Sequence, residues 1–212
     1  MQVIDNFFPE ELFQQLQRNV LGPNMPWYYV PTISAPPWLQ VEDPLAKETD
    51  GMQCVFYDKD RNLASAEYMF LRKYFLVMLD KLGYTEDNLL RVRASLKWPK
   101  PGITSEYYNI PHIDSASTHK TIVFYLNDAD GDTRLFHQRQ DPNTKTLHSN
   151  PSEEEKMEYA KQFIKSGFTV EASVTPKANR LLMFDGLQYH TAGMPVNSDR
   201  RVIFNINLNE TK

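Results

Sequence analysis

The hydrophobic pattern of this chain changes its period near residue 90, and this change limits the folds open to it. Before that point apolar residues recur every three or four positions, which is typical of helices. After it, short runs alternate or are rich in β-branched and aromatic residues, as strands are. Helices first and strands later predict an antiparallel sheet with helices packed on one side, not a repeated βαβ unit. The strand-like runs are RVRASLK (91–97), KTIVFYLND (120–128), FTVEASV (168–174), RLLMFDG (180–186) and RVIFNINL (201–208).

Two helices are predicted in the first ninety residues. Pro9 suits a first helical position, Glu10 and Glu11 favour the positive end of the helix dipole, and apolar residues follow at intervals of four. The segment 65–83, SAEYMFLRKYFLVMLDKLG, is apolar on most faces and stops at Gly83. This second pattern predicts a buried helix with a glycine cap.

A segment rich in proline and aromatic residues, 21–40, lies between the two predicted helices. Its large apolar side chains predict an ordered irregular segment and not a free linker. The part from Trp27 to Trp38 is expected either to fold over the mouth of the sheet as a lid or to support the sheet's edge.

A third helix is predicted as an insertion among the strands, near residues 152–165. Ser152 and Glu155 have the spacing of a capping box, and Gly167 marks the end of about three helical turns.

Composition narrows the class of protein. The 212 residues are 41% hydrophobic and 12% aromatic, which is enough to build the core of one domain. The expected domain spans 1–212, with 1–90 as mainly helical support and 91–208 as the strand core. The net charge of −4 argues against nucleic acid or an anionic membrane as a partner. Cys54 is the one cysteine, so a cytoplasmic setting is expected and the thiol is expected to be buried and unreactive. No apolar stretch reaches the roughly 18 residues of a membrane span.

The motif PHIDSAS contains the first candidate metal ligands. His112 and Asp114 point to one face of an extended strand, with Ile113 on the other. His190 is the candidate third ligand, because the segment LLMFDGLQYHTAG delivers it at the end of a strong apolar strand and just before a turn. Two imidazoles and one carboxylate leave three metal positions open, as non-haem Fe(II) enzymes require. By itself the H-x-D pattern is a weak signal, since a strand end with hydrogen-bonded polar residues looks the same.

Four segments together resemble the Fe(II)- and 2-oxoglutarate-dependent dioxygenases, in the branch related to prolyl 4-hydroxylases. The resemblance is strong from about residue 91 to 208 and looser before it, where MQVIDNFFPEEL resembles the helical opening of that branch. It implies a mainly β, α+β fold, the double-stranded β-helix or jelly roll, with N-terminal helices packed on the major sheet. The segments are PHIDS, TIVFYLNDADGDTRLF, VTPKANRLLMFDGLQYHTAGMPV and DRRVIFNINL.

The resemblance assigns roles residue by residue. It places His112, Asp114 and His190 at the metal, and it places a basic residue about ten positions later at the distal carboxylate of 2-oxoglutarate. Both Arg200 and Arg201 fit that spacing.

Strand parity favours one of the two arginines. The even-numbered positions of RVIFNINL are apolar and are expected to pack on the helices, which turns Arg201 into the barrel; Arg200 stays open because the spacing varies among relatives. Tyr125 matches a tyrosine that hydrogen-bonds the same carboxylate in many relatives, and Thr121 shares its face, which is expected to line the cofactor pocket. Asn179 stands where relatives have glycine, a mild departure because Asn tolerates a left-handed backbone.

The reaction implied by the resemblance is hydroxylation with O2, Fe(II) and 2-oxoglutarate, with succinate and CO2 as co-products and ascorbate as a stimulant. No catalytic residue beyond the metal site is expected. The substrate is open between a prolyl or other peptidyl residue and a small metabolite, because this fold and triad serve many substrates. The alternative is a catalytically idle jelly roll that binds a metal or a partner. Zinc-dependent hydrolysis is disfavoured because no H-E-x-x-H motif is present.

The remaining histidines and the aromatic residues before the metal motif are interpreted mainly as structure. His119 is expected to be solvated, with a contact near the metal site as the alternative. His137 and His148 are expected to be exposed. Packing is expected for the aromatic residues, with binding of co-substrate or substrate as the alternative: Trp98, Tyr107 and Tyr108.

Overall fold

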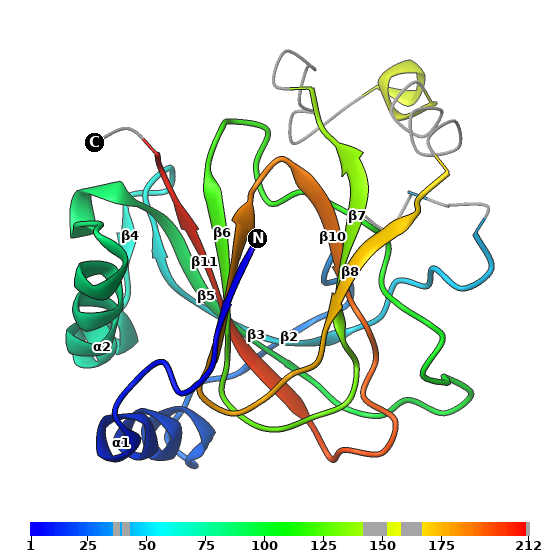
Figure 1. The fold of residues 1–212 in the computed structure, drawn as a ribbon. Helices are drawn as coiled ribbons and strands as arrows, with labels where there is room; N and C mark the ends of the chain where they lie inside the picture. Colours follow the sequence, from blue (N-terminus) through cyan, green and yellow to red (C-terminus); the bar gives the residue numbers. More distant parts are fainter. Residues whose placement is uncertain (36–38, 40–42, 142–151, 158–166, 211–212) are drawn as a thin grey trace.

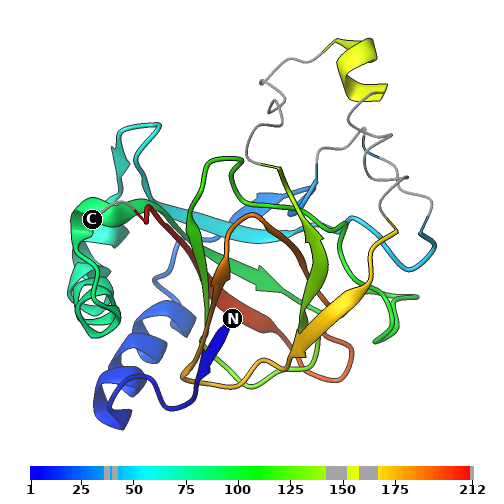
Figure 2. The same cartoon turned by 45° about the horizontal axis from the view of Figure 1, so that its top comes forward.

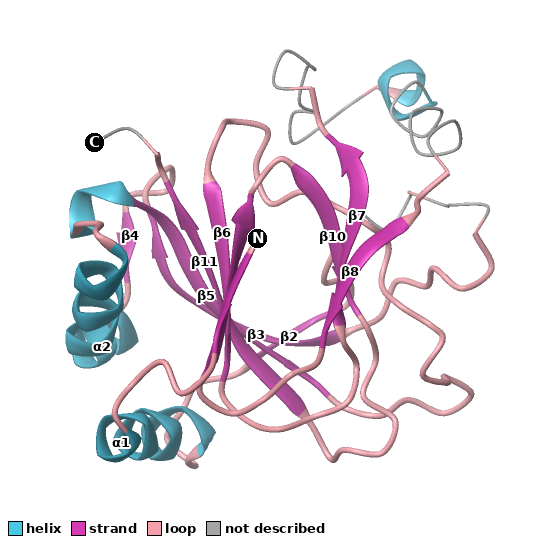
Figure 3. Cartoon of the chain, in the orientation of Figure 1, coloured by secondary structure: helices cyan, strands magenta, loops and turns pink. Residues whose placement is uncertain are grey.

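The computed structural model describes residues 1–35, 39, 43–141, 152–157 and 167–210. Two antiparallel sheets dominate it (Figures 1 and 3). The large sheet has eight strands. Seven of them follow the order β1 (Gln2–Ile4), β9 (Arg180–Asp185), β6 (Lys120–Tyr125), β11 (Arg201–Leu208), β5 (Leu89–Lys97), β3 (Gly51–Asp58) and β2 (Tyr28–Val30). The eighth, β4 (Leu63–Ala64), pairs with β3. The small sheet has the order β10 (Gln188–Ala192), β7 (Thr133–Arg139) and β8 (Val170–Val174).

From β6 onward the chain passes back and forth between the two sheets (Figure 2). β7 and β8 lie in the small sheet, β9 in the large one, β10 in the small one and β11 again in the large one. An extended segment before β6 pairs with β10 through an isolated bridge between His112 and His190, and Tyr108 forms a second bridge with Gly193, just after β10. This alternation is the topology of a double-stranded β-helix, so the predicted fold class is confirmed.

Two helices cover the face of the large sheet that points away from the small sheet (Figure 1). They are α1 (Glu10–Leu21) and α2 (Ala66–Leu82). Ser65 caps the start of α2, and Gly83 ends it with a φ of 76°, as the sequence predicts. The apolar faces of β5 and β11 pack on these helices, so Val92, Phe204 and their same-face neighbours lie in the main core.

Phe124 on β6 shows how the N-terminal segment is held to the sheet. Its ring contacts those of Phe7, Phe8 and Phe13, with centroids 6.2, 5.3 and 6.1 Å away, each near an edge-to-face geometry. Aromatic pairs of this kind each contribute about 0.5–1.5 kcal/mol beyond the area that they bury.

One expectation about α2 needs correction. A helix apolar on most faces was expected to be buried all round, but Met69 and Phe70 are 63% and 65% exposed. Only the side facing the sheet is buried, because α2 forms an outer layer and nothing among the described residues covers its far side. None of the described helices is long and apolar enough to cross a membrane.

The first ninety residues also contain strands that the sequence reading missed. β3 lies between β5 and β2 in the large sheet, and β1 extends that sheet at its other edge. The sequence of β3, GMQCVFYD, has no strict alternation, and its burial is correspondingly irregular. Its strand state comes from pairing with β5, which no local pattern reveals.

The two irregular segments are described in part. Ser152 and Glu155 form the predicted capping box, with the Ser152 N–H donating to Glu155 and the Glu155 N–H donating to the Ser152 hydroxyl, and residues 153–157 are helical. The predicted remainder of that helix lies outside the described residues. In the other segment, β2 pairs with β3 and so supports the sheet edge, while Trp38 lies outside the described residues.

Candidate metal centre

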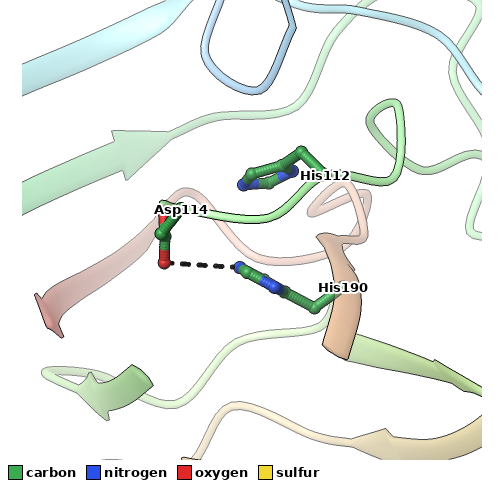
Figure 4. Close-up of side chains that lie close together, drawn as sticks. All are labelled: His112, Asp114 and His190. Atoms are coloured by element: carbon green, nitrogen blue, oxygen red, sulfur yellow. Dashed lines mark ion pairs between the residues drawn. The ribbon is translucent and has the colours of Figure 1, made fainter. Parts of the chain in front are cut away.

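The three predicted ligands meet between the two sheets (Figure 4). The ligand atoms of His112, Asp114 and His190 all lie within 4.8 Å of one another. Nε2 of His190 is 3.6 Å from Oδ2 of Asp114, and the two imidazole rings are 4.6 Å apart between centroids. Among the described residues, this is the one cluster of three or more such side chains that could hold a metal ion.

Backbone pairing fixes the two histidines side by side. The His112 N–H donates to the His190 carbonyl at 3.0 Å, and the His190 N–H donates back at 2.9 Å. His190 lies in the middle of β10, so the sequence reading that put it at the end of the preceding apolar strand is wrong by one element. Ile113 packs against a separate apolar cluster, so the expected opposite orientation of the H-x-D motif is confirmed.

Hydrogen bonds present both imidazoles in the form that binds a metal. Nδ1 of His112 lies 3.2 Å from the carbonyl of Ile110, and Nδ1 of His190 lies 3.2 Å from that of Gln188. A carbonyl only accepts, so each Nδ1 carries the proton and each Nε2 keeps a lone pair. Burial lowers the pKa of His112 to about 3 and also lowers that of His190, so both rings are neutral at neutral pH.

Asp114 is surrounded by donor side chains. Its Oδ1 accepts from Arg93 at 2.8 Å and Arg91 at 3.1 Å, and its Oδ2 accepts from Asn205 at 2.9 Å and Asn207 at 3.1 Å. Burial opposes ionisation of this side chain, which is 1% exposed, but the charges of Arg93 and Arg91 hold the pKa of Asp114 well below its usual value. The carboxylate is therefore ionised at neutral pH. A carboxylate and two neutral imidazoles suit Fe(II), so the donor set fits the metal that the resemblance implies.

A narrow cavity of about 40 Å³ leads from the two histidines to a basic end. Val123 and Ile203 form part of its wall, and Arg201 lines its far end. Ile33 and Ser34 also line it, from the segment expected either as a lid or as support for the sheet's edge. A larger cavity of about 360 Å³ lies between α1 and α2, away from this chemistry.

The two candidate arginines differ in position as strand parity predicts. Arg201 is 2% exposed, and its Nε and one terminal nitrogen donate to the Gly131 carbonyl at 2.9 Å and the Thr133 hydroxyl at 2.8 Å. Arg200 is exposed. Tyr125 is buried beside Arg201 and donates to the Thr133 hydroxyl at 2.7 Å.

Thr121 lies at the metal end and not beside Arg201. Its hydroxyl is 3.4 Å from Oδ2 of Asp114 and 3.2 Å from Nε2 of His119. His119 is fully buried, so the expectation of a solvated histidine is wrong, and the alternative of a contact near the metal site is the one that the structure supports.

Several residues of the site were not identified from the sequence. Their positions follow from the same parity that selects Arg201, because the odd-numbered residues of β5 and β11 face the barrel. If water covered that face of the sheet, these polar residues would be ordinary surface residues. The alternating sequence of β5 is equally compatible with such a surface. The missed residues are Arg91, Arg93, Lys97, Asn205 and Asn207.

The remaining aromatic and cysteine predictions have structural outcomes. Tyr108 packs in the apolar cluster around Phe136 and donates to Asp43. Trp98 and Tyr107 each lie under a lysine side chain. Cys54 is buried, and burial raises the pKa of its thiol to about 11, so it is unreactive as expected. His137 is exposed as predicted, and His148 lies outside the described residues.

Solved structures with a similar fold include a member of the 2OG-Fe(II) oxygenase family. An oxidoreductase of the 2OG-Fe(II) oxygenase family from Burkholderia pseudomallei aligns at 11% identity over 99% of this chain and 85% of that chain, with a TM-score of 0.58. The epimerase SnoN, in complex with Fe3+, α-ketoglutarate and nogalamycin RO, aligns with a TM-score of 0.54 at 13% identity. The alignment covers 99% of this chain and 78% of that chain. A prolyl hydroxylase from Trichoplax adhaerens, in complex with a hypoxia inducible factor oxygen degradation domain peptide fragment, aligns with a TM-score of 0.50 at 16% identity. The alignment covers 99% of this chain and 83% of that chain.

These alignments define the class by fold: a double-stranded β-helix of the 2-oxoglutarate oxygenase type. The chain belongs to the family described as "Family of unknown function (DUF6445)", whose model matches residues 64–201. A comparison with curated proteins gives no match. The closer kinship with prolyl 4-hydroxylases stays a prediction.

Proposed function

We propose that this chain is an Fe(II)- and 2-oxoglutarate-dependent oxygenase that hydroxylates its substrate. One observation supports this most directly: two histidines of the triad line one end of a cavity, and a buried arginine lines the other. A 2-oxo acid bound through its keto-acid end at the metal would extend along this cavity toward Arg201. The guanidinium fork suits the distal carboxylate of 2-oxoglutarate.

The residues around the triad orient and shield it. The carbonyls of Ile110 and Gln188 fix the two imidazole rings, and Arg93 with Arg91 keeps Asp114 ionised. The chemistry supplied by Fe(II) and 2-oxoglutarate, when bound, is oxidative decarboxylation to succinate and CO2 coupled to hydroxylation of a C–H bond.

Part of the cavity wall between its two ends is apolar, which favours the same chemistry. Val123 and Ile203 line it between the metal end and the basic end, and both are nearly fully buried. Such walls exclude water from the carbon chain of the co-substrate and strengthen the electrostatic contacts at both ends.

The primary substrate is proposed as a peptidyl residue, including prolyl, or a small metabolite. The solved structures of this fold include one with a peptide fragment and one with nogalamycin RO, so the fold accommodates both classes. The proposal treats residues 1–212 as one domain. The main core supports this, because it joins α1 and α2 to the large sheet. The single buried thiol is compatible with a cytoplasmic setting, which is part of the proposal.

Anaerobic titration of Fe(II) and then 2-oxoglutarate into the metal-free protein tests the proposal. The expected result is a weak visible charge-transfer band, retained in Arg200→Ala and lost in Arg201→Ala at the same co-substrate concentration. Arg200 is a matched control because it removes the same charge one residue away, on the outer face of the barrel.

Turnover separates the proposal from its alternative. On admission of O2, the oxygenase converts 2-oxoglutarate to succinate, whereas an idle jelly roll binds the metal and forms none. Absence of the band in folded wild-type protein would rule out the proposed co-substrate site itself.

A further inference from the structure

Two buried cations face each other at the basic end of the cavity. Arg201 on β11 and Lys97 on β5 are directly paired across the two strands, and each is 2% exposed. Both line the same cavity as His112 and His190. The resemblance assigns one basic residue to this end, so Lys97 is an additional charge that it does not explain.

Both cations are hydrogen-bonded only to neutral oxygen atoms among the described residues. Arg201 donates to the Gly131 carbonyl and the Thr133 hydroxyl, and the Lys97 ammonium donates to Oδ1 of Asn109. No described carboxylate forms an ion pair with either of them.

Glu48 is the carboxylate whose charge attracts Lys97, but neither of its oxygen atoms is hydrogen-bonded to the ammonium, and its Oε2 is buried with no hydrogen-bond partner among the described residues. Its Oε1 accepts the backbone N–H groups of Ile33 and Ser34, the two residues that reach the cavity from the N-terminal segment. Glu48 therefore holds this segment in place and leaves the ammonium without a bonded counter-ion.

Two like charges buried side by side are unfavourable unless an anion joins them. Burial and then the neighbouring charge of Arg201 lower the pKa of Lys97 to about 7, which is the physical sign of that cost. An anion between the two groups would remove the repulsion and restore the charged form of the lysine.

We propose that Lys97 is a second carboxylate-binding residue, which with Arg201 grips the distal carboxylate of 2-oxoglutarate and makes the site selective for a 2-oxo dicarboxylate over a 2-oxo monocarboxylate. This inference rests on the proposed function. Asn109 positions the ammonium, and its side-chain nitrogen is in turn bonded to the Thr49 hydroxyl at 3.0 Å.

The test compares two ligands that differ only at the far end. Anaerobic calorimetric titrations with Mn(II)-loaded full-length protein measure the affinity for 2-oxoglutarate and for 2-oxopentanoate, which carries a methyl group in place of the distal carboxylate. Lys97→Met is expected to weaken 2-oxoglutarate binding by about tenfold or more, the loss of one charge-assisted hydrogen bond, and to leave 2-oxopentanoate binding unchanged. Lys100→Met is the control, because Lys100 is an equal charge three residues away that pairs with Asp50.

The outcomes distinguish this inference from the function on which it rests. If wild-type protein binds 2-oxoglutarate and Lys97→Met binds it equally well, the role of Lys97 is disproved while the proposed function stands. If Lys97→Met weakens both ligands alike, Lys97 only supports the structure and the inference fails. If wild-type protein with Mn(II) binds no 2-oxoglutarate, both proposals fall.

A second measurement needs no variant, so it holds even if Lys97→Met does not fold. The pKa of Lys97 is followed by NMR of 13Cε-lysine-labelled wild-type protein. Saturating 2-oxoglutarate is expected to raise it by about one unit or more, and 2-oxopentanoate is expected to leave it unchanged. If the pKa of Lys97 is the same with 2-oxoglutarate as with 2-oxopentanoate, the assignment of Lys97 to the distal carboxylate is wrong.

Discussion

At the scale of single residues, Asp114 differs from an isolated metal ligand because it neutralises two arginines. Arg91 and Arg93 both donate to its Oδ1, and its side chain is 1% exposed. Removing a buried carboxylate leaves its partners as uncompensated charges, which commonly costs about 3–5 kcal/mol.

We therefore predict that Asp114→Ala lowers the stability of the metal-free protein by about 3 kcal/mol, in addition to abolishing metal binding. Urea denaturation of the metal-free protein measures this. The double variant Asp114→Ala with Arg93→Met restores part of the charge balance and is expected to be more stable than the single variant. If the single variant is as stable as wild type, Asp114 serves the metal alone.

The depressed pKa of Lys97 makes a prediction about pH. The pKa falls from 10.5 in the unfolded chain to about 7 in the fold, so between these values the unfolded state binds more protons. The stability of the metal-free protein therefore rises with pH across this window through this group. Below the window the contribution of Lys97 no longer changes with pH. The charged groups that act on Lys97 are Arg201, Glu48 and Lys100.

Chemical denaturation of wild type and Lys97→Met from pH 6 to 10 isolates this contribution. The stability difference between the two proteins is expected to shift in favour of wild type as the pH rises above about 7. If the stability difference between the two proteins does not change with pH, the pKa of Lys97 is not lowered in the folded protein. Comparison with the variant is needed because Cys54, with its raised pKa of about 11, acts in the opposite direction at alkaline pH.

At the scale of elements, Asn179 joins β9 to the segment before α1. Its φ is 63°, its Oδ1 accepts the Phe8 N–H at 2.9 Å, and its Nδ2 donates to the Phe8 carbonyl at 2.8 Å. Asn179 therefore adopts the left-handed conformation that asparagine tolerates, and its side chain forms two hydrogen bonds that glycine cannot form.

Asn179→Ala is predicted to destabilise the protein by about 3 kcal/mol, because it leaves two buried backbone groups unpaired and adds strain at positive φ. Asn179→Gly loses the same hydrogen bonds without the strain, so it is expected to be about 1 kcal/mol more stable than the alanine variant. Equilibrium unfolding of the three proteins gives the order. A glycine variant as stable as wild type would mean that the contacts with Phe8 contribute nothing.

The elements show which parts of the fold a sequence reveals. Regular periods and caps predict α2, β5, β8, β9 and β11 well, because the determining contacts are local or face one core. β3 was missed because its strand state depends on pairing with β5, more than thirty residues later in the chain. The triad was identified from its ligand types, but its supporting residues were not, since a polar face inside a barrel and a polar face in water have the same sequence pattern.

At the scale of the whole molecule, the candidate site connects the two sheets. His190 belongs to the small sheet, Arg201 belongs to the large one, and His112 lies on the segment that pairs with β10. A metal with its co-substrate would therefore join elements that otherwise meet mainly through apolar packing.

We predict that Mn(II) together with 2-oxoglutarate slows amide hydrogen exchange in β7 and β10 by more than in α2. At a ligand concentration a hundredfold above Kd, the gain in global stability is about 2.7 kcal/mol. His112→Ala, which removes a metal ligand, is expected to lose the protection in the small sheet. Equal slowing in α2 would mean that the ligands act only through global unfolding and do not connect the sheets.

The surroundings of the triad also determine whether metal binding releases protons into the solvent. Most protein ligands must lose protons before they bind a metal, so uptake acidifies the medium. Here Asp114 is already ionised, and His112 and His190 are already neutral, at neutral pH. The site would take up its metal without releasing protons, so the calorimetric enthalpy of metal binding at pH 7 should be the same in buffers with very different heats of ionisation.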